Sequence, residues 1–222
     1  MSNTIDNIEH CFQCDQTVVD LYCNEVSKLT DEQQRCLAAL ILTGFVCQHR
    51  SIYVNIVVDT KYLQEQYPEP SQHKWAPTEI EVENQYLMVD YQHVIDGQGT
   101  PYLELKANIS DVVSFSCASI DANSSSAAIV YGISHRDGDE VFGDFHPVHK
   151  NLSGAVMPDA SSPDGLPPVT ADRNFMSLNA EVKNSGVETL DIKLAVFLQA
   201  GSEQVLFGYF KWSPSITITA QS

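Results

Sequence analysis

Residues 190–198 read LDIKLAVFL, and this stretch decides the fold class. Apolar side chains occupy every even position, whereas the polar Asp191 and Lys193 occupy odd positions. Successive side chains of a strand point to opposite faces of a sheet, so a period of two predicts one buried face and one solvent-facing face. Antiparallel sheets commonly divide their faces in this way, and the stretch therefore predicts an antiparallel strand.

Eight further segments have strand-like composition, and turn-rich segments separate them. They are residues 52–58, 86–91, 103–109, 112–117, 127–133, 176–182, 205–212 and 216–219. So many short strands predict a mainly β protein, an antiparallel two-sheet β-sandwich of jelly-roll or immunoglobulin-like type, over residues 51–222. Residues 67–77 and 158–168 are rich in proline, which predicts long surface loops.

The first 50 residues have a different pattern and predict a helical extension. Residues 15–29 carry an apolar stripe at helical spacing, and Thr30 with Gln33 forms a capping-box pattern before a second helix. The second helix is apolar nearly all round, so it needs a surface to cover it. We therefore predict an N-terminal α-helical hairpin over residues 1–50, packed against the sandwich or against another subunit.

The chain is strongly acidic. Its 222 residues include 12 Lys and Arg and 29 Asp and Glu, for a formal net charge of −17. This surface repels nucleic-acid phosphates and anionic membranes, so we expect neither as a partner. The longest apolar run, residues 36–45, is interrupted and far too short to cross a bilayer, and the first residues lack a secretory pattern. These features predict a cytoplasmic protein, and no motif indicates a cofactor.

Four ordered motifs carry a resemblance to a known family. They are VNIVVDTKYLQEQYPEPS at 54–71, YLELKANISDVVSFS at 102–116, AAIVYGI at 127–133 and GYFKWSPSITI at 208–218. With these motifs, which span residues 51–220 or so, the chain resembles the PixA/AidA family of bacterial inclusion-body proteins. The resemblance implies cytoplasmic inclusions in insect-pathogenic bacteria, and related members are linked to virulence toward nematodes. It implies no enzymatic activity and no catalytic residues.

The sequence departs from the family pattern in three places. Position 213 is Ser, where the family more often has Asp. The namesake is rich in methionine, but this chain has only four methionines, so a role in methionine storage has little support. The first 50 residues, with five of the six cysteines, look like an added segment.

The motif at 208–218 predicts architecture rather than chemistry. Its aromatic residues, including Tyr209 and Trp212, are expected to fill the core from a late strand, because each large ring buries much area. Pro214 lacks an N–H donor, so we expect it to end that strand and redirect the chain into a final one.

The N-terminal cysteines leave three roles open. Cys11 and Cys14 form a C-x-x-C, and a zinc site would combine them with residues such as Cys47 and His49. A regulatory or intermolecular disulfide is a second role, and packing as small apolar side chains is the third. The spacing favours packing, since Cys47 and His49 form a poor second ligand pair.

The densest polar cluster is DGDE at 137–140, followed by Asp144, His146 and His149. Carboxylates at alternate positions suit calcium, but the remaining spacing of a helix–loop–helix calcium site is absent from the sequence. A solvated loop is therefore the favoured interpretation.

We predict a non-enzymatic, self-associating inclusion-body protein. Two alternatives stay open: a β-sandwich module that binds carbohydrate or another host ligand, and a virulence-linked effector. For the binding module, exposed aromatic rings in or near loops are the candidates, namely Trp75, Tyr67 and Tyr91. A small hydrolase or metalloenzyme ranks last, because no catalytic motif occurs.

Overall fold

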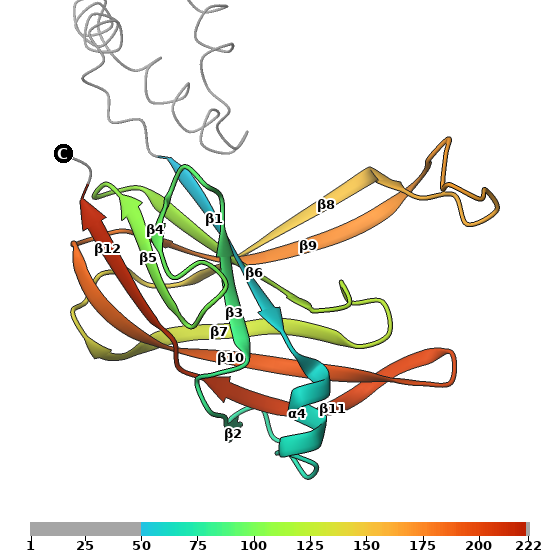
Figure 1. The fold of residues 1–222 in the computed structure, drawn as a ribbon, viewed down its shortest axis with the longest axis horizontal. Helices are drawn as coiled ribbons and strands as arrows, with labels where there is room; N and C mark the ends of the chain where they lie inside the picture. Colours follow the sequence, from blue (N-terminus) through green and yellow to red (C-terminus); the bar gives the residue numbers. More distant parts are fainter. Residues whose placement is uncertain (1–49, 221–222) are drawn as a thin grey trace, which may run out of the picture. The chain divides into compact units, whose positions relative to one another are not determined.

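The computed structural model describes residues 50–220, which form two β-sheets and one short helix (Figure 1). The predicted helical hairpin and the motif Cys11–Cys14 lie outside the described residues. The elements are β1 Ser51–Val58, α4 Thr60–Gln66, β2 Thr78–Glu79, β3 Gln85–Val89, β4 Val94–Asp96, β5 Tyr102–Ala107, β6 Val112–Ser119, β7 Ala127–Gly138, β8 His146–Met157, β9 Val169–Glu181, β10 Gly186–Ala200, β11 Glu203–Trp212 and β12 Ser215–Ala220.

One sheet has five strands and the other has seven. The five-stranded sheet has the order β3-β1-β6-β9-β8. In the seven-stranded sheet the order is β2-β11-β10-β12-β5-β4, with β7 paired to the other side of β10. Buried residues from both sheets form one core cluster, as expected when each strand turns its apolar positions inward.

Strand β10, which contains the LDIKLAVFL stretch, is the centre of the seven-stranded sheet. Its even residues from Leu190 to Val196 are fully buried. It pairs with β7 along one edge and with both β11 and β12 along the other. The predicted strand therefore exists and is longer than the sequence pattern indicated.

Pro214 interrupts the edge that β11 and β12 form along β10. Ile192 pairs with Trp212 before the break and Thr189 pairs with Ser215 after it, so the register is the same on both sides. The Pro214 carbonyl accepts a hydrogen bond from the Leu190 N–H at 3.0 Å. The proline thus separates two strands along one partner, and β12 gains β5 as a second neighbour.

The prediction of purely antiparallel sheets is wrong. β1 pairs with β6 in parallel, β12 pairs with β5 in parallel, and β2 pairs with β11 in parallel. Alternation of apolar and polar residues shows only that one face of a strand is buried. It is compatible with a parallel neighbouring strand as well as with an antiparallel one. Jelly rolls and immunoglobulin folds are built of antiparallel strands, so neither name describes these mixed sheets.

The aromatic residues of the C-terminal motif lie in and around the core. Trp212 and Phe210 are fully buried, and the Trp212 Nε1–H donates a hydrogen bond to the Val82 carbonyl at 2.7 Å. Tyr209 packs edge-to-face against Tyr131, with 5.6 Å between ring centroids. Side chains alternate between the two faces of β11, so Tyr209 points away from the face on which Phe210 and Trp212 are buried.

Helix α4 and strand β8 have no counterpart among the predicted elements. Asp59 caps α4 by accepting a hydrogen bond from the Tyr62 N–H at 2.9 Å, and Leu63 is the large side chain that the helix buries. Strand β8 is exposed at almost every position, so its sequence carries no alternation from which to predict it.

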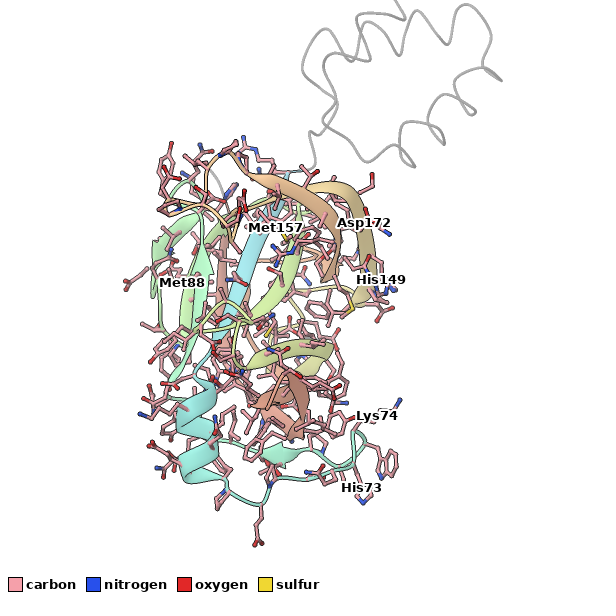
Figure 2. The ribbon with its side chains drawn as sticks, turned by 90° about the vertical axis from the view of Figure 1, so that its right-hand side faces the viewer. His73, Lys74, Met88, His149, Met157 and Asp172 are labelled. Atoms are coloured by element: carbon pink, nitrogen blue, oxygen red, sulfur yellow. The ribbon has the colours of Figure 1, made fainter. Side chains whose placement is uncertain are left out.

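Strands β8 and β9 extend beyond the sandwich as a two-stranded ribbon. β9 pairs with β6 only over Leu178–Glu181, and its residues 169–177 have only β8 as a neighbouring strand. We call residues 148–177 the arm. Figure 1 shows it diverging from the β10–β11 hairpin, and Figure 2 labels His149, Met157 and Asp172 along it.

Candidate functional site

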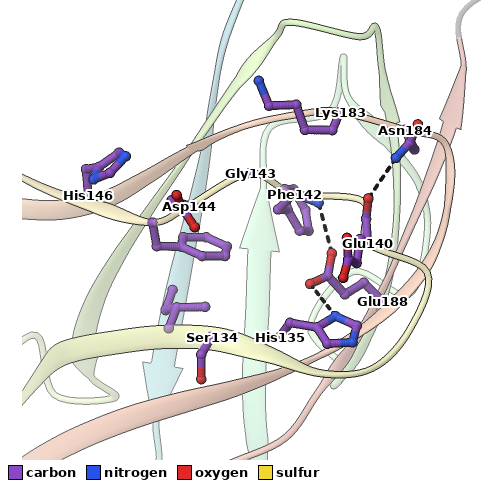
Figure 3. Close-up of a pocket in the computed structure, with 12 residues that line it drawn as sticks. Ser134, His135, Glu140, Phe142, Gly143, Asp144, His146, Lys183, Asn184 and Glu188 are labelled. Carbon is purple, nitrogen blue, oxygen red and sulfur yellow. Dashed lines mark hydrogen bonds and ion pairs between the residues drawn. The ribbon is translucent and has the colours of Figure 1, made fainter.

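A half-open pocket of about 740 Å³ lies where β7, the β7–β8 connection and the β9–β10 turn meet (Figure 3). Its lining is largely polar and carries charges of both signs. Its polar and charged side chains include Ser134, His135, Glu140, Asp144, Lys183 and Glu188.

Glu188 is a buried carboxylate at the floor of the pocket, with 1% of its surface exposed. Its Oε2 accepts hydrogen bonds from the N–H groups of Val141, at 2.8 Å, and Phe142, at 2.9 Å. Its Oε1 accepts a third hydrogen bond from His135 Nδ1 at 3.0 Å. Burying a charged group is costly unless hydrogen bonds replace its water, and here three donors replace it.

His135 is held by this contact in one orientation, and its ring is partly exposed to the pocket. An ionised carboxylate can only accept hydrogen bonds, so His135 Nδ1 carries the proton of the hydrogen bond between His135 and Glu188. A carboxylate–histidine pair of this kind serves hydrolases when a nucleophile contacts the second ring nitrogen. Across residues 50–220, no hydrogen bond joins the His135 ring to a serine, threonine or cysteine side chain, so this arrangement lacks that part.

Hydrogen bonds also connect the β7–β8 segment with the β9–β10 turn beside the pocket. Asn184 Nδ2 donates to the Glu140 carbonyl at 2.9 Å, and the Val187 N–H donates to Asp139 Oδ2 at 2.9 Å. Lys183 forms an ion pair with Glu181. These contacts hold in place the segments that surround the polar recess.

The acidic and histidine cluster of the sequence does not form a metal centre in the part of the chain that the structure describes. No three His, Cys, Asp or Glu side chains within residues 50–220 lie close enough to hold a metal ion. Asp144 and His146 line the pocket, whereas His149 lies in β8 on the opposite face of that strand from His146.

The three aromatic candidates for ligand binding are not brought together. Trp75 is 76% exposed and stacks on His73, with 5.0 Å between ring centroids. Tyr91 is 83% exposed in another loop, between β3 and β4. Tyr67 packs edge-to-face on Phe210, and its hydroxyl accepts a hydrogen bond from the Glu81 N–H at 2.9 Å. Tyr67 is therefore part of the packing around the core rather than an exposed platform.

The loop that presents Trp75 is attached to two strands of the sheet, β11 and β7. The Tyr209 N–H donates to the Ser71 carbonyl at 2.8 Å, and the Tyr131 hydroxyl donates to the Lys74 carbonyl at 2.8 Å. In Figure 2, His73 and Lys74 lie below the labelled arm residues Met157, Asp172 and His149. Trp75 is thus an exposed ring on a loop that the sheet holds in place.

The cysteines divide between the described and undescribed parts of the chain. Cys11, Cys14, Cys47 and His49 lie outside the described residues, so their predicted roles stay predictions. Cys117 in β6 packs against the core, and burial raises the pKa of its thiol. A thiol with a raised pKa is a poor nucleophile at neutral pH.

Ser213 joins a network of charged side chains at the surface. Its hydroxyl donates to Asp191 Oδ1 at 2.8 Å and accepts from Arg136 Nη1 at 2.7 Å. Arg136 also pairs with Glu79 at 2.6 Å. Burial alone raises the pKa of Asp191, but the hydrogen bonds from Ser213 and Arg136 outweigh it and the pKa is lowered. Ser213, at the position where the family more often has Asp, therefore contacts Arg136 directly.

The comparisons with known proteins agree with this fold. A family model described as PixA, inclusion body protein, matches residues 50–218. This chain belongs to the PixA family of inclusion body proteins. A crystal structure of the inclusion body protein PixA from Burkholderia cenocepacia J2315 is similar, with a TM-score of 0.67 and 28% sequence identity. The match covers 77% of this chain and 96% of that chain. No curated protein matches the sequence.

The PixA-family match includes both halves of the pocket and the whole arm, since it runs from residue 50 to residue 218. Sequence reasoning did not select His135 or Glu188. One signal was present in the sequence. Glu188 occupies an even position, like Leu190 and Ile192, so it is a charged residue on the face of the strand that is expected to be buried. Among the described residues no helix is both long and apolar enough to cross a membrane.

Proposed function

We propose that this PixA-family member is a non-enzymatic protein that self-associates into cytoplasmic inclusions of a host-associated bacterium. Family membership supports an inclusion-body protein. In the pocket, the Glu188 carboxylate already accepts hydrogen bonds from the backbone N–H groups of Val141 and Phe142, which favours a structural role for this residue over a catalytic one.

The observation that carries self-association is the exposure of apolar side chains along the arm. Large aliphatic and aromatic side chains on both of its strands are exposed: Val148, Leu152, Val156, Val169 and Phe175. Scattered exposed apolar residues are ordinary, but several of them gathered on one two-stranded ribbon are typical of an interaction site. A ribbon of two strands is also only marginally stable in water by itself, so a further layer or strand would stabilise it.

Self-association is expected to strengthen as the pH falls from 8 to 5. At pH 7 the formal charge of −17 makes the copies repel, and the protons that the chain takes up on acidification reduce that charge. Light scattering of the intact chain at low salt measures the mass at each pH. Screening by about 0.5 M salt at pH 8 is expected to have the same direction of effect. A mass equal to one copy under every condition would contradict the proposal.

The same series with and without reductant separates association through strands from association through cysteines. Loss of the larger species on reduction would assign the contact to a disulfide. An unchanged mass would leave the apolar surface as its source.

Trp75 supports a second candidate function, the binding of carbohydrate. An exposed, stacked ring on a loop held by the sheet is a suitable platform for a sugar ring. For this function we expect binding to an oligosaccharide on a glycan array. The variant Trp75→Ala should weaken that binding about tenfold, while its free energy of unfolding changes by no more than about 0.5 kcal/mol. Tyr53→Ala, at an exposed ring of β1 that is not among the binding candidates, is the matched control, and a blank array would count against the idea.

A further inference from the structure

Strand β8 is an edge of the five-stranded sheet, and within residues 50–220 it pairs with β9 alone. The strand order ends at β8, whose paired neighbour is β9 (Figure 1). From His146 to Leu152 the pairing with β9 is regular, so the outer backbone groups of β8 form a straight row. An edge of this kind is a template for pairing with another chain.

The edge at the other side of the same sheet is covered by the protein itself. The Val89 N–H in β3 donates to Gln98 Oε1 at 3.1 Å, and Gln98 Nε2 donates back to the Val89 carbonyl at 2.6 Å. The Gly99 N–H donates to the Leu87 carbonyl at 2.9 Å. Residues 98–100 therefore occupy the outer row of β3.

The edges of the seven-stranded sheet are protected in other ways. The segment at residues 71–79 covers part of β11. The Ser71 carbonyl accepts a hydrogen bond from the Tyr209 N–H, and β2 pairs with residues 210 and 211 of β11. β4 has only three residues. β7 is long, but its pairing with β10 is irregular at two places, and Arg136 and Asp137 charge it. Bulges, charges, prolines and short length are the usual protections of an edge. β8 contains Pro147, Lys150 and a register shift after Leu152, but its pairing is regular from His146 to Leu152, which is longer than any regular stretch of β7.

The register of the arm places a group of apolar side chains on one face beside this edge. Lys150 pairs directly with Phe175, so Val148 and Leu152 are the diagonal neighbours of that ring on the same face. Val148, Leu152 and Phe175 are 38%, 42% and 47% exposed. A third strand added at β8 would cover part of this group.

The charge of β8 differs from that of the chain around it. The strand contains Lys150 and two histidines but no Asp or Glu, in a protein with 29 acidic residues. Two copies of a protein with a charge of −17 repel one another over most of their surfaces. A contact through β8 brings no carboxylate of either strand against another, so it is the edge at which a second copy meets the least repulsion.

We propose that β8 pairs with β8 of a second copy of this chain, antiparallel and about a two-fold axis, which joins the two five-stranded sheets into one. A strand that pairs with itself across a two-fold axis must be antiparallel, and the same surface then serves both copies. Registers centred on His149 or Asn151 place Lys150 opposite Val148 or Leu152 of the second copy and avoid a lysine–lysine pair. The inference rests on the proposed self-association and names its surface.

The test introduces positive charge at the edge of the intact chain. In the double variant Val148→Lys and Leu152→Lys, each β8 carries three lysines, which repel the second copy in every antiparallel register. We expect the dissociation constant of the pair to rise roughly a hundredfold. The control Ile95→Lys with Val205→Lys makes the same charge change at exposed aliphatic residues of β4 and β11, and should associate like the unchanged protein. Both variants reduce the net negative charge, so a general charge effect would strengthen association instead.

Sedimentation measures the association, and amide hydrogen exchange of residues 146–152 locates it. We expect slow exchange in the associated protein and fast exchange in the Val148→Lys, Leu152→Lys variant. Unaltered association of that variant would overturn the β8 contact but leave self-association standing. A monomeric unchanged protein at all concentrations would overturn both. Slow exchange of β8 in a monomer would overturn the second copy in favour of residues 1–49 of the same chain as the occupant.

Discussion

Replacing Trp212 with alanine is expected to lower the free energy of unfolding by about 3–5 kcal/mol, the usual loss when a large aromatic side chain is removed from a core. The ring is fully buried at the end of β11, where Trp212 pairs with Ile192 of the central strand. Its Nε1–H also satisfies the Val82 carbonyl, so the substitution removes a hydrogen bond together with the packing. Urea denaturation followed by circular dichroism measures the loss.

The protein offers a matched control for this prediction, because its only other tryptophan is Trp75. Trp75→Ala makes the same chemical change at a ring that is mostly exposed, and should leave the free energy of unfolding nearly unchanged. Trp212→Phe keeps most of the ring but removes the donor, so an intermediate loss is expected. A loss below about 1 kcal/mol for Trp212→Ala would mean that the core fills the space left by the ring, contrary to its place in the structure.

The strands that alternate were predictable, and those that do not were missed. Leu190 to Val196 showed its period of two because one face of β10 meets the core and the other does not. β8 is exposed at almost every position, so its residues, which include Pro147, Lys150 and Gly154, carry no period. The direction of neighbouring strands was also beyond the sequence, because alternation is the same in parallel and antiparallel pairs. Between β1 and β6 the chain adds β3 to the same sheet and β2, β4 and β5 to the other one, so no hairpin joins β1 to β6 and the two strands can run parallel.

The candidate pocket was not predicted, since its parts are distant in the sequence. His135 and Glu188 are 53 residues apart and meet because β7 and β10 are neighbours. The sequence cluster at residues 137–149 supplied part of the wall, but it gave no sign that a buried carboxylate from β10 holds the loop. The available signal was a charged residue, Glu188, among the even positions that β10 buries. The sequence could not show why it is there, because the N–H groups that it binds reach it only in the folded chain.

Replacing Glu188 with alanine is the second large effect that we expect, a loss of about 2–5 kcal/mol in the free energy of unfolding. The carboxylate accepts from the N–H groups of Val141 and Phe142, and both of these residues are buried. Alanine leaves these two donors without their acceptor, and each unsatisfied buried donor costs about 1–3 kcal/mol. Removing the buried charge offsets part of this cost, but it does not supply a new acceptor.

Two further variants separate the acceptor role of Glu188 from its charge. In Glu188→Gln the amide oxygen still accepts from Val141 and Phe142, but the amide N–H₂ meets His135 Nδ1, which must then become an acceptor. We expect this variant to lose only about 1–2 kcal/mol. Glu140→Ala removes an exposed carboxylate from the same pocket and should change the free energy of unfolding by less than about 0.5 kcal/mol. The order alanine at 188, then glutamine at 188, then alanine at 140 follows from hydrogen-bond satisfaction. Equal losses for the two variants at 188 would instead assign the effect to the charge, because the glutamine keeps an acceptor that the alanine lacks.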